Sequence, residues 1–210
     1  MQVTPYPVQF YVDYPDRPLD RLSSAFRIFV AIPISIVLAA VSGGEFLRFG
    51  QDASDGSIAA AGGIVFIGPL LMIVFRQKYP RWWFDWNLQL ARFSSRVAAY
   101  ILLMDDRYPS TDEEQSVHLD LPYPDVPRDL NRWLPLVKWL LAIPHYIVGI
   151  FLFIALVIVA IIVWFAVLFT GMYPRGLFDF TEGVMRWYTR VVAYAFILVT
   201  DVYPPFRLSA

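Results

Sequence analysis

Long apolar stretches separated by short polar segments dominate the sequence. In the first half, residues Ile28–Val41 and Ile58–Phe75 are almost entirely apolar, and the polar segment GGEFLRFGQDASDGS lies between them. Each arm has about 15–18 residues, which is near the lower limit of the ~17–25 residues that a helix needs to cross a bilayer. The pattern predicts a hydrophobic helical hairpin.

The second half contains a longer apolar stretch, Leu134–Phe169, which is interrupted only by Lys138, Pro144 and His145. One straight helix of this length would measure about 54 Å, whereas the hydrocarbon core of a bilayer is ~30 Å thick. The stretch therefore has to bend at Pro144, lie partly in the interface, or fold as a second hairpin. Its correspondence to the first half favours a hairpin, whereas the uncharged run that begins at Tyr146 favours one span.

Each half opens with a short segment in which apolar and polar residues alternate. The apolar members are Val8, Phe10 and Val12 in the first half, and Val117, Leu119 and Leu121 in the second. A period of two is typical of a half-buried strand. We expect the two strands to lie outside the bilayer, where their edges can be hydrated, and to pair about a pseudo-two-fold axis. Asp20 and Asp129, which follow proline-rich turns, are candidate N-caps of the next helices.

A third pattern is amphipathic and occurs twice. The segments YPRWWFDWNLQLARFSSRVAAY (Tyr79–Tyr100) and YPRGLFDFTEGVMRWYTRVVAY (Tyr173–Tyr194) are identical at ten of 22 positions. Helical spacing of three and four residues places one set of residues on a common face in each segment: Asp85, Gln89, Arg92, Arg96 and Tyr100, and Asp179, Gly183, Arg186, Arg190 and Tyr194. The pattern predicts an amphipathic helix in the plane of the membrane, with Asp85 and Asp179 as its N-caps.

Four sequence blocks recur in the same order, which indicates an internal repeat. The motif Tyr-Pro-Asp-x-Pro-x-Asp begins at Tyr14 and Tyr123, Ala-Ile-Pro at Ala31 and Ala142, and Asp-x-Tyr-Pro ends each half. We expect a first membrane repeat over residues 1–110, an acidic linker over 111–116 and a second repeat over 117–210. The predicted fold is an all-α integral membrane protein with short strands outside the bilayer. Each repeat contains a hydrophobic hairpin and an in-plane amphipathic helix.

The composition supports a membrane protein. Hydrophobic residues make up 58% of the 210 residues, above the ~45–50% apolar content of soluble domains. The net charge of −1 provides no field that would attract nucleic acid. Because cysteine is absent, disulfides, thiolate metal sites and cysteine nucleophiles are excluded.

The charge distribution predicts an orientation. Basic residues flank the first hairpin, whereas the segment between its arms carries one arginine and three acidic residues. Because loops rich in Lys and Arg stay in the cytoplasm, both ends of this hairpin and the N-terminus are expected there.

Three interpretations explain the repeated arginines Arg92, Arg96, Arg186 and Arg190. They could extend their side chains toward water and form ion pairs within the repeat, for example with Asp106 or Asp16. They could bind anionic lipid headgroups or a partner protein, together with Tyr100 and Tyr194, since two arginines one turn apart suit a phosphate. They could also line a pore between the repeats.

No motif for catalysis, for a cofactor or for a metal occurs. The sequence lacks a glycine-rich phosphate loop, a Gly-x-Ser-x-Gly elbow and a His-Glu-x-x-His pair. The only histidines, His118 and His145, are not expected to converge. We therefore predict no catalytic residue, no cofactor and no metal ligand.

The repeated pattern Tyr-Pro…Phe-Asp…Arg-[aromatic]-x-x-Arg-Val-x-Ala-Tyr…Asp-x-Tyr-Pro resembles the bacterial DUF4389 membrane domain, a family without an assigned function. Two tandem copies would cover nearly the whole chain. The resemblance implies a membrane location and brings no catalytic residues. Together with the apolar segments, we expect a multi-pass protein of the bacterial cytoplasmic (inner) membrane. The first copy departs from the pattern, because it carries the polar insertion and its end lacks the sequence YPPF found at Tyr203–Phe206.

These observations predict a non-enzymatic accessory or scaffolding subunit of a larger membrane protein complex. Its partners would be membrane lipids, including anionic ones, and partner helices or further copies of itself. The alternatives are a small transporter or channel built on the internal pseudo-two-fold axis, a lipid-binding membrane protein, and an enzyme that acts on lipids.

Overall fold

A computed structural model describes residues 6–42 and 63–209 of the chain. The first half contains β1 (Gln9–Val12), α1 (Arg21–Ala25), α2 (Arg27–Ser42), α3 (Gly63–Arg76) and α4 (Arg81–Ile101). The second half contains β2 (Val117–Asp120), α5 (Val126–Asp129), α6 (Pro135–Leu141), α7 (Ile143–Thr170), α8 (Arg175–Val192) and the π-helical turn η2 (Ala193–Ile197). The polar segment of the predicted hairpin, Gly43–Ser57, lies outside the described residues.

The two predicted strands exist and pair with each other. Strands β1 and β2 form a two-stranded antiparallel sheet in which Phe10 lies opposite Leu119 and Val12 opposite Val117. All six alternating apolar residues are buried, and they join the largest apolar core of the described structure. The opposite face of the sheet is more exposed and carries Tyr11 stacked on His118. This confirms the alternation and the pairing of the two strands.

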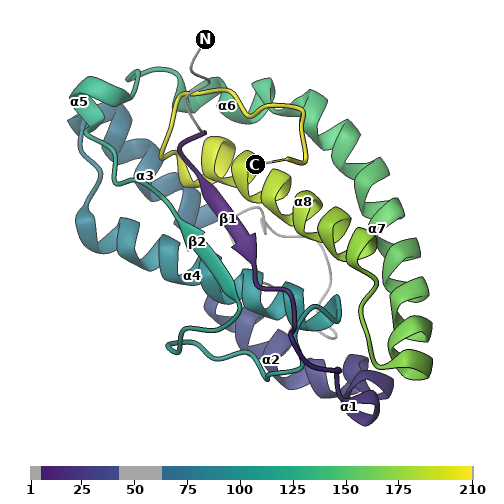
Figure 1. Ribbon diagram of the computed structural model, residues 1–210. Helices are drawn as coiled ribbons and strands as arrows, with labels where there is room; N and C mark the ends of the chain where they lie inside the picture. Colours follow the sequence, from purple (N-terminus) through teal and green to yellow (C-terminus); the bar gives the residue numbers. More distant parts are fainter. Residues whose placement is uncertain (1–5, 43–62, 210) are drawn as a thin grey trace, which may run out of the picture.

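The amphipathic helix of each half packs on the strand of the other half. Helix α4 of the first half packs on β2 of the second half, and α8 of the second half packs on β1 of the first. Figure 1 shows the sheet in front of these two helices, with α7 along the right edge and α3 on the left. Neither half therefore completes the core around its own strand.

The long apolar stretch of the second half does not form a hairpin, so that prediction is wrong for this half. The stretch divides into the short α6 and the continuous 28-residue α7. Pro144 lies in the first turn of α7, where a proline costs no helical hydrogen bond. Helix α7 ends at Gly171, whose φ of 76° is the left-handed conformation typical of a helix C-terminus.

Helix α7 is long and apolar enough to cross a membrane. At ~1.5 Å per residue it is about 42 Å long, which exceeds the ~30 Å hydrocarbon core. Helix α2 and residues Ile67–Arg76 of α3 are shorter apolar helices. Among the helices that the structure describes, α7 is thus the single clear candidate for a span.

Three of the four predicted N-caps are wrong. Helices α4 and α8 begin one turn earlier than expected, after Pro80 and Pro174. Asp85 and Asp179 therefore lie inside these helices. Asp129 is the last residue of α5. Asp20 is confirmed as the N-cap of α1, because its side chain accepts a hydrogen bond from the Leu22 amide.

Candidate functional site

Arg92 and Arg186, which are equivalent in the sequence repeat, each hold one strand of the sheet. The Nε of Arg92 donates to the main-chain carbonyl of Leu119 at 2.9 Å, and the Nε of Arg186 donates to that of Phe10 at 2.8 Å. Each arginine also pairs with a carboxylate, Arg92 with Asp120 and Arg186 with Glu182.

The position of these two carbonyls follows from the sheet. The amide of Asp13 donates to Ser116 at 2.8 Å, which makes these residues a hydrogen-bonded pair. Hydrogen-bonded and non-hydrogen-bonded pairs alternate along an antiparallel ladder, so Phe10 and Leu119 belong to a non-hydrogen-bonded pair. Their carbonyls therefore point out of the sheet, where an edge strand otherwise has no partner.

Arg96 and Arg190, one turn further along, hold irregular segments of the chain. Arg96 donates to the carbonyl of Ser110 at 3.0 Å, and Arg190 donates to that of Ser209 at 3.1 Å. Both arginines are buried. Burial lowers the pKa of each, and the adjacent Arg92 and Arg186, respectively, lower it further.

The structure therefore directs all four predicted arginines to groups within the chain. Of the predicted ion pairs within a repeat, the structure shows Arg186 with Glu182, whereas Arg92 pairs with Asp120 of the other half and Asp106 pairs with Arg17 instead. Arg96 and Arg190 are buried and do not extend toward water. Contact of these residues with headgroups or with a partner stays a prediction.

The two predicted tyrosines each contact a second, buried cation that the sequence analysis did not select. The Arg27 guanidinium lies 4.0 Å from the centre of the Tyr100 ring, and the Lys138 ammonium lies 5.1 Å from that of Tyr194. Arg27 also donates to the carbonyl of Asp105 at 2.8 Å. The cation beside the repeated tyrosine is thus an arginine in the first half and a lysine in the second.

Lys138 is the most enclosed charged residue of the described chain, with an exposed fraction of 0%. Its Nζ lies 2.7 Å from an Asp201 carboxylate oxygen and donates to the Thr200 carbonyl at 2.7 Å. Burial lowers the pKa of Lys138, and Asp201 acts in the opposite direction. The sequence contains a signal for these two buried cations. Lys138 interrupts an apolar stretch, and Arg27 and Lys138 each lie four residues before an Ala-Ile-Pro block.

Asp85 and Asp179 form exposed ion pairs instead of caps. Asp85 pairs with Arg81 at 3.2 Å and Asp179 pairs with Arg175 at 3.6 Å, each four residues earlier on the same helix. Exposed pairs of this kind contribute at most ~0.5 kcal/mol. These carboxylates therefore stabilise the first turns of α4 and α8 only slightly.

Asp105 provides a prediction for the pH dependence of stability. Burial raises the pKa of its carboxyl, but hydrogen bonds from Ser116 and Arg107 outweigh it, so the pKa lies below its ordinary value of 3.8. A carboxyl with a depressed pKa contributes stability above its unfolded-state pKa, and this contribution is lost as the pH falls through the folded-state pKa. The stability difference between the wild type and Asp105→Asn should be constant from about pH 7 to 5 and shrink toward about pH 3.

Chemical unfolding of both proteins across this pH range would test the prediction. Asp112→Asn is the control, because Asp112 is an exposed acidic residue of the linker. A difference for Asp105→Asn that does not change with pH would contradict the assigned role of its carboxylate.

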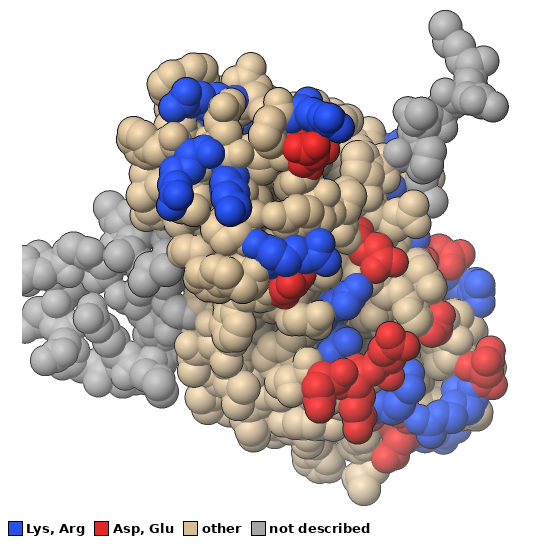
Figure 2. Space-filling model, turned by 90° about the vertical axis from the view of Figure 1, so that its left-hand side faces the viewer, with Lys and Arg blue, Asp and Glu red and all other residues tan. Residues whose placement is uncertain are grey.

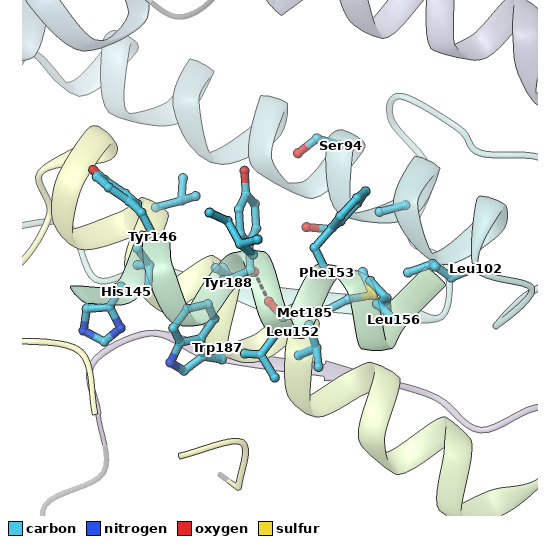
Figure 3. A pocket seen from close by; sticks show the side chains of 18 of the residues that line it. Ser94, Leu102, His145, Tyr146, Leu152, Phe153, Leu156, Met185, Trp187 and Tyr188 are labelled. Carbon is cyan, nitrogen blue, oxygen red and sulfur yellow. Dashed lines mark hydrogen bonds between the residues drawn. The ribbon is translucent and has the colours of Figure 1, made fainter. Parts of the chain in front are cut away.

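An apolar cavity of about 650 Å³ lies between α4, α7 and α8. Figure 3 shows the side chains that surround it, including Ser94 from α4, Phe153 and Leu156 from α7, and Met185 and Tyr188 from α8. None of the predicted site residues lines this cavity. The amphipathic and apolar patterns predict the helices around the cavity, but they do not predict a cavity between these helices.

Charged and apolar surfaces are unevenly distributed. In the face that Figure 2 shows, most acidic side chains lie toward the right, the side of the sheet, together with several basic ones. Another group of basic side chains lies at the upper left, and an uncharged surface lies below it. Within residues 6–42 and 63–209, no three His, Cys, Asp or Glu side chains come together in a way that could hold a metal ion.

Comparison with known proteins gives one match. Residues 133–207, which contain α6, α7, α8 and η2, match the family model described as a domain of unknown function, DUF4389. No curated protein and no solved structure matches the chain. The match covers one copy, so the tandem arrangement stays a prediction. Residues 133–207 are therefore similar to the DUF4389 family.

Proposed function

We propose that this protein is a non-enzymatic, multi-pass protein of the bacterial cytoplasmic membrane that acts as an accessory or scaffolding subunit of a larger assembly. The observation that carries the proposal is the apolar surface of α7. Only His145, Val163 and Val167 of this 28-residue helix are buried. Phe151 and Phe169 are 68% and 77% exposed. A soluble monomer rarely leaves so large an apolar surface uncovered.

The apolar surface extends to the first half. In α2, Ile28 and Phe29 are 75% and 69% exposed, and in α3 Phe75 is 71% exposed. Lipid chains or partner helices would cover these faces. We infer that α2 and α3 are the two arms of the membrane hairpin, with the basic residues at their outer ends on the cytoplasmic side.

We also infer that the two halves are tandem copies of one unit. The support lies in corresponding contacts. Arg92 and Arg186 hold the two strands, and Arg81 and Arg175 each stack on a tyrosine that lies in the other half, Tyr123 and Tyr14. Contacts exchanged between halves in this way are expected of a pseudo-two-fold axis.

For contact with anionic headgroups, Arg81 and Arg175 are better placed than the four buried or partly buried arginines. Their side chains are 67% and 66% exposed. Trp82 and Trp86, on the first turns of α4, are also exposed. Exposed Trp beside Arg is typical of residues at the membrane–water interface.

Gentle extraction from native membranes, followed by native gel separation and mass spectrometry of the bands, tests the assembly proposal. We expect the protein to migrate with a larger membrane complex in fixed stoichiometry. Migration as a lone 24.2 kDa chain or as a homo-oligomer would contradict the accessory role and would favour the transport alternative.

A further inference from the structure

We infer that the cavity between α4, α7 and α8 holds an acyl chain of a membrane lipid. The inference rests on the membrane location in the proposed function, but it adds a bound ligand class and a defined site. The volume of about 650 Å³ falls within the ~300–1,000 Å³ range of small-molecule pockets. It is also several times larger than the ~150 Å³ apolar cavities known to bind benzene.

Two hydroxyls in the cavity wall need no polar ligand. The Thr189 hydroxyl donates to the Met185 carbonyl at 2.8 Å, shown dashed in Figure 3, and the Ser94 hydroxyl donates to the Ala91 carbonyl at 2.9 Å. Hydroxyls bonded back to their own helix in this way leave little hydrogen-bonding capacity. Ordered water needs two to four polar partners, so hydrocarbon suits this cavity better than water does.

The mouth of the cavity opens on the apolar surface of α7. Ile150 and Phe153 line the cavity and are 61% and 65% exposed. Phe151 and Ile154, their neighbours on the same helix, belong to the exposed apolar surface. A lipid chain that covers α7 can therefore enter the cavity from the side without crossing a polar barrier.

The corresponding place in the first half is filled by the protein itself. Ile34 and Leu38 of α2 pack there against Phe93 and Val97 of α4. The repeat alignment matches these residues, in order, to His145, Gly149, Trp187 and Val191, and all four line the cavity.

Two of these pairs differ in size. Leu38 corresponds to Gly149 and Phe93 to the larger Trp187, and a Cβ added at Gly149 would lie 3.6 Å from the Trp187 ring. The tryptophan ring therefore takes up part of the volume that the Leu38 side chain occupies in the first half. A lipid chain would supply hydrocarbon in the volume that remains.

Photolabelling of the purified full chain tests the inference. The protein is reconstituted in phosphatidylcholine vesicles that contain a phosphatidylcholine with a diazirine in the middle of one acyl chain, irradiated, and analysed by peptide mass spectrometry. We expect adducts on the outer surface of α7, for example at Ile161, and also on Ala98 of α4 and Met185 of α8. Met185 is only 8% exposed, so bulk lipid would not label it.

Two adjacent residues of α7 provide a matched pair of variants. Leu156 lines the cavity, whereas Val157 is 44% exposed and is not part of its wall. Leu156→Trp should fill the cavity and lower the adducts on Ala98 and Met185 roughly tenfold, which corresponds to about 1.4 kcal/mol. Val157→Trp should leave these adducts unchanged, and both variants should keep the label at Ile161.

The outcomes separate the inference from the proposed function. Adducts at Ile161 with none on Ala98 or Met185 would overturn the lipid site and leave the membrane location intact. A lack of adducts on all these helices would contradict the membrane location itself. A photoactivatable residue at position 156 that crosslinks in native membranes to another protein would assign the cavity to a partner helix and would also overturn the inference.

Discussion

Replacing Lys138 with methionine should lower the free energy of unfolding by about 3–5 kcal/mol, the cost of leaving one member of a buried ion pair without its partner. Methionine nearly preserves the length and the apolar contacts of the side chain. The loss would therefore report on Asp201 and on the Thr200 carbonyl, which both contact the ammonium. Urea unfolding in detergent micelles provides the measurement.

Lys78→Met is the matched control, because Lys78 is the only other lysine of the chain and its side chain is exposed. This substitution should change stability by less than about 0.5 kcal/mol. The double variant Lys138→Met/Asp201→Asn should recover part of the loss, since it removes both charges. Equal effects of Lys138→Met and Lys78→Met would refute the role of the ion pair.

Replacing Arg186 with glutamine should lower stability by about 2–4 kcal/mol, because hydrogen bonds from a charged group contribute about 1.5–3 kcal/mol each. Arg186 donates to the carbonyls of Phe10 and Leu208 and pairs with Glu182. The loss should be concentrated at β1. Hydrogen exchange, followed by peptide mass spectrometry, should show faster exchange in the peptides that contain β1 than in those from α7.

Arg175→Gln is the control on the same helix. Arg175 is 66% exposed, pairs weakly with Asp179 and stacks on the Tyr14 ring, so its replacement should cost about 1 kcal/mol, less than that of Arg186. Arg92→Gln should have an intermediate effect at β2, because the Arg92 side chain is more exposed than that of Arg186, 29% against 12%. Uniform exchange across the chain in Arg186→Gln would mean that the arginine does not act on β1 in particular.

The strands and the arginine faces could be predicted from the sequence because both follow simple periodicity. Alternation placed Phe10 and Leu119 on the buried face, and helical spacing placed Arg92 beside Arg96. The groups that accept hydrogen bonds from these arginines could not be predicted. They are main-chain carbonyls such as that of Ser110, and every residue has one, so no residue type marks them.

The predicted hairpin of the second half failed for a local reason. Pro144 and His145 were taken as a break within one apolar element. The break instead falls at Ala142, between α6 and α7, and proline in a first turn favours the helix that follows. The caps failed similarly, because the aromatic cluster before Asp85 is helical itself and Pro80 precedes it.

The cavity could not be predicted either. The alignment of Leu38 with Gly149 is visible in the sequence, but a smaller residue usually lets its neighbours move closer. Whether space remains depends on how far α7 stands from α4, and the packing of the whole chain sets that distance.

The packing of each amphipathic helix on the strand of the other half has a consequence for the order of synthesis. Strand β1 ends at Val12 and its partner begins at Val117, about 105 residues later, which at ~5–20 residues per second takes roughly 5–20 s. Helix α8, whose Arg186 holds β1, emerges later still. During this interval the N-terminal strand leaves the ribosome with its backbone unpaired. The strand is therefore complete only after α8 has been made, so a ribosome that stalls before α8 would release a product with an open strand edge.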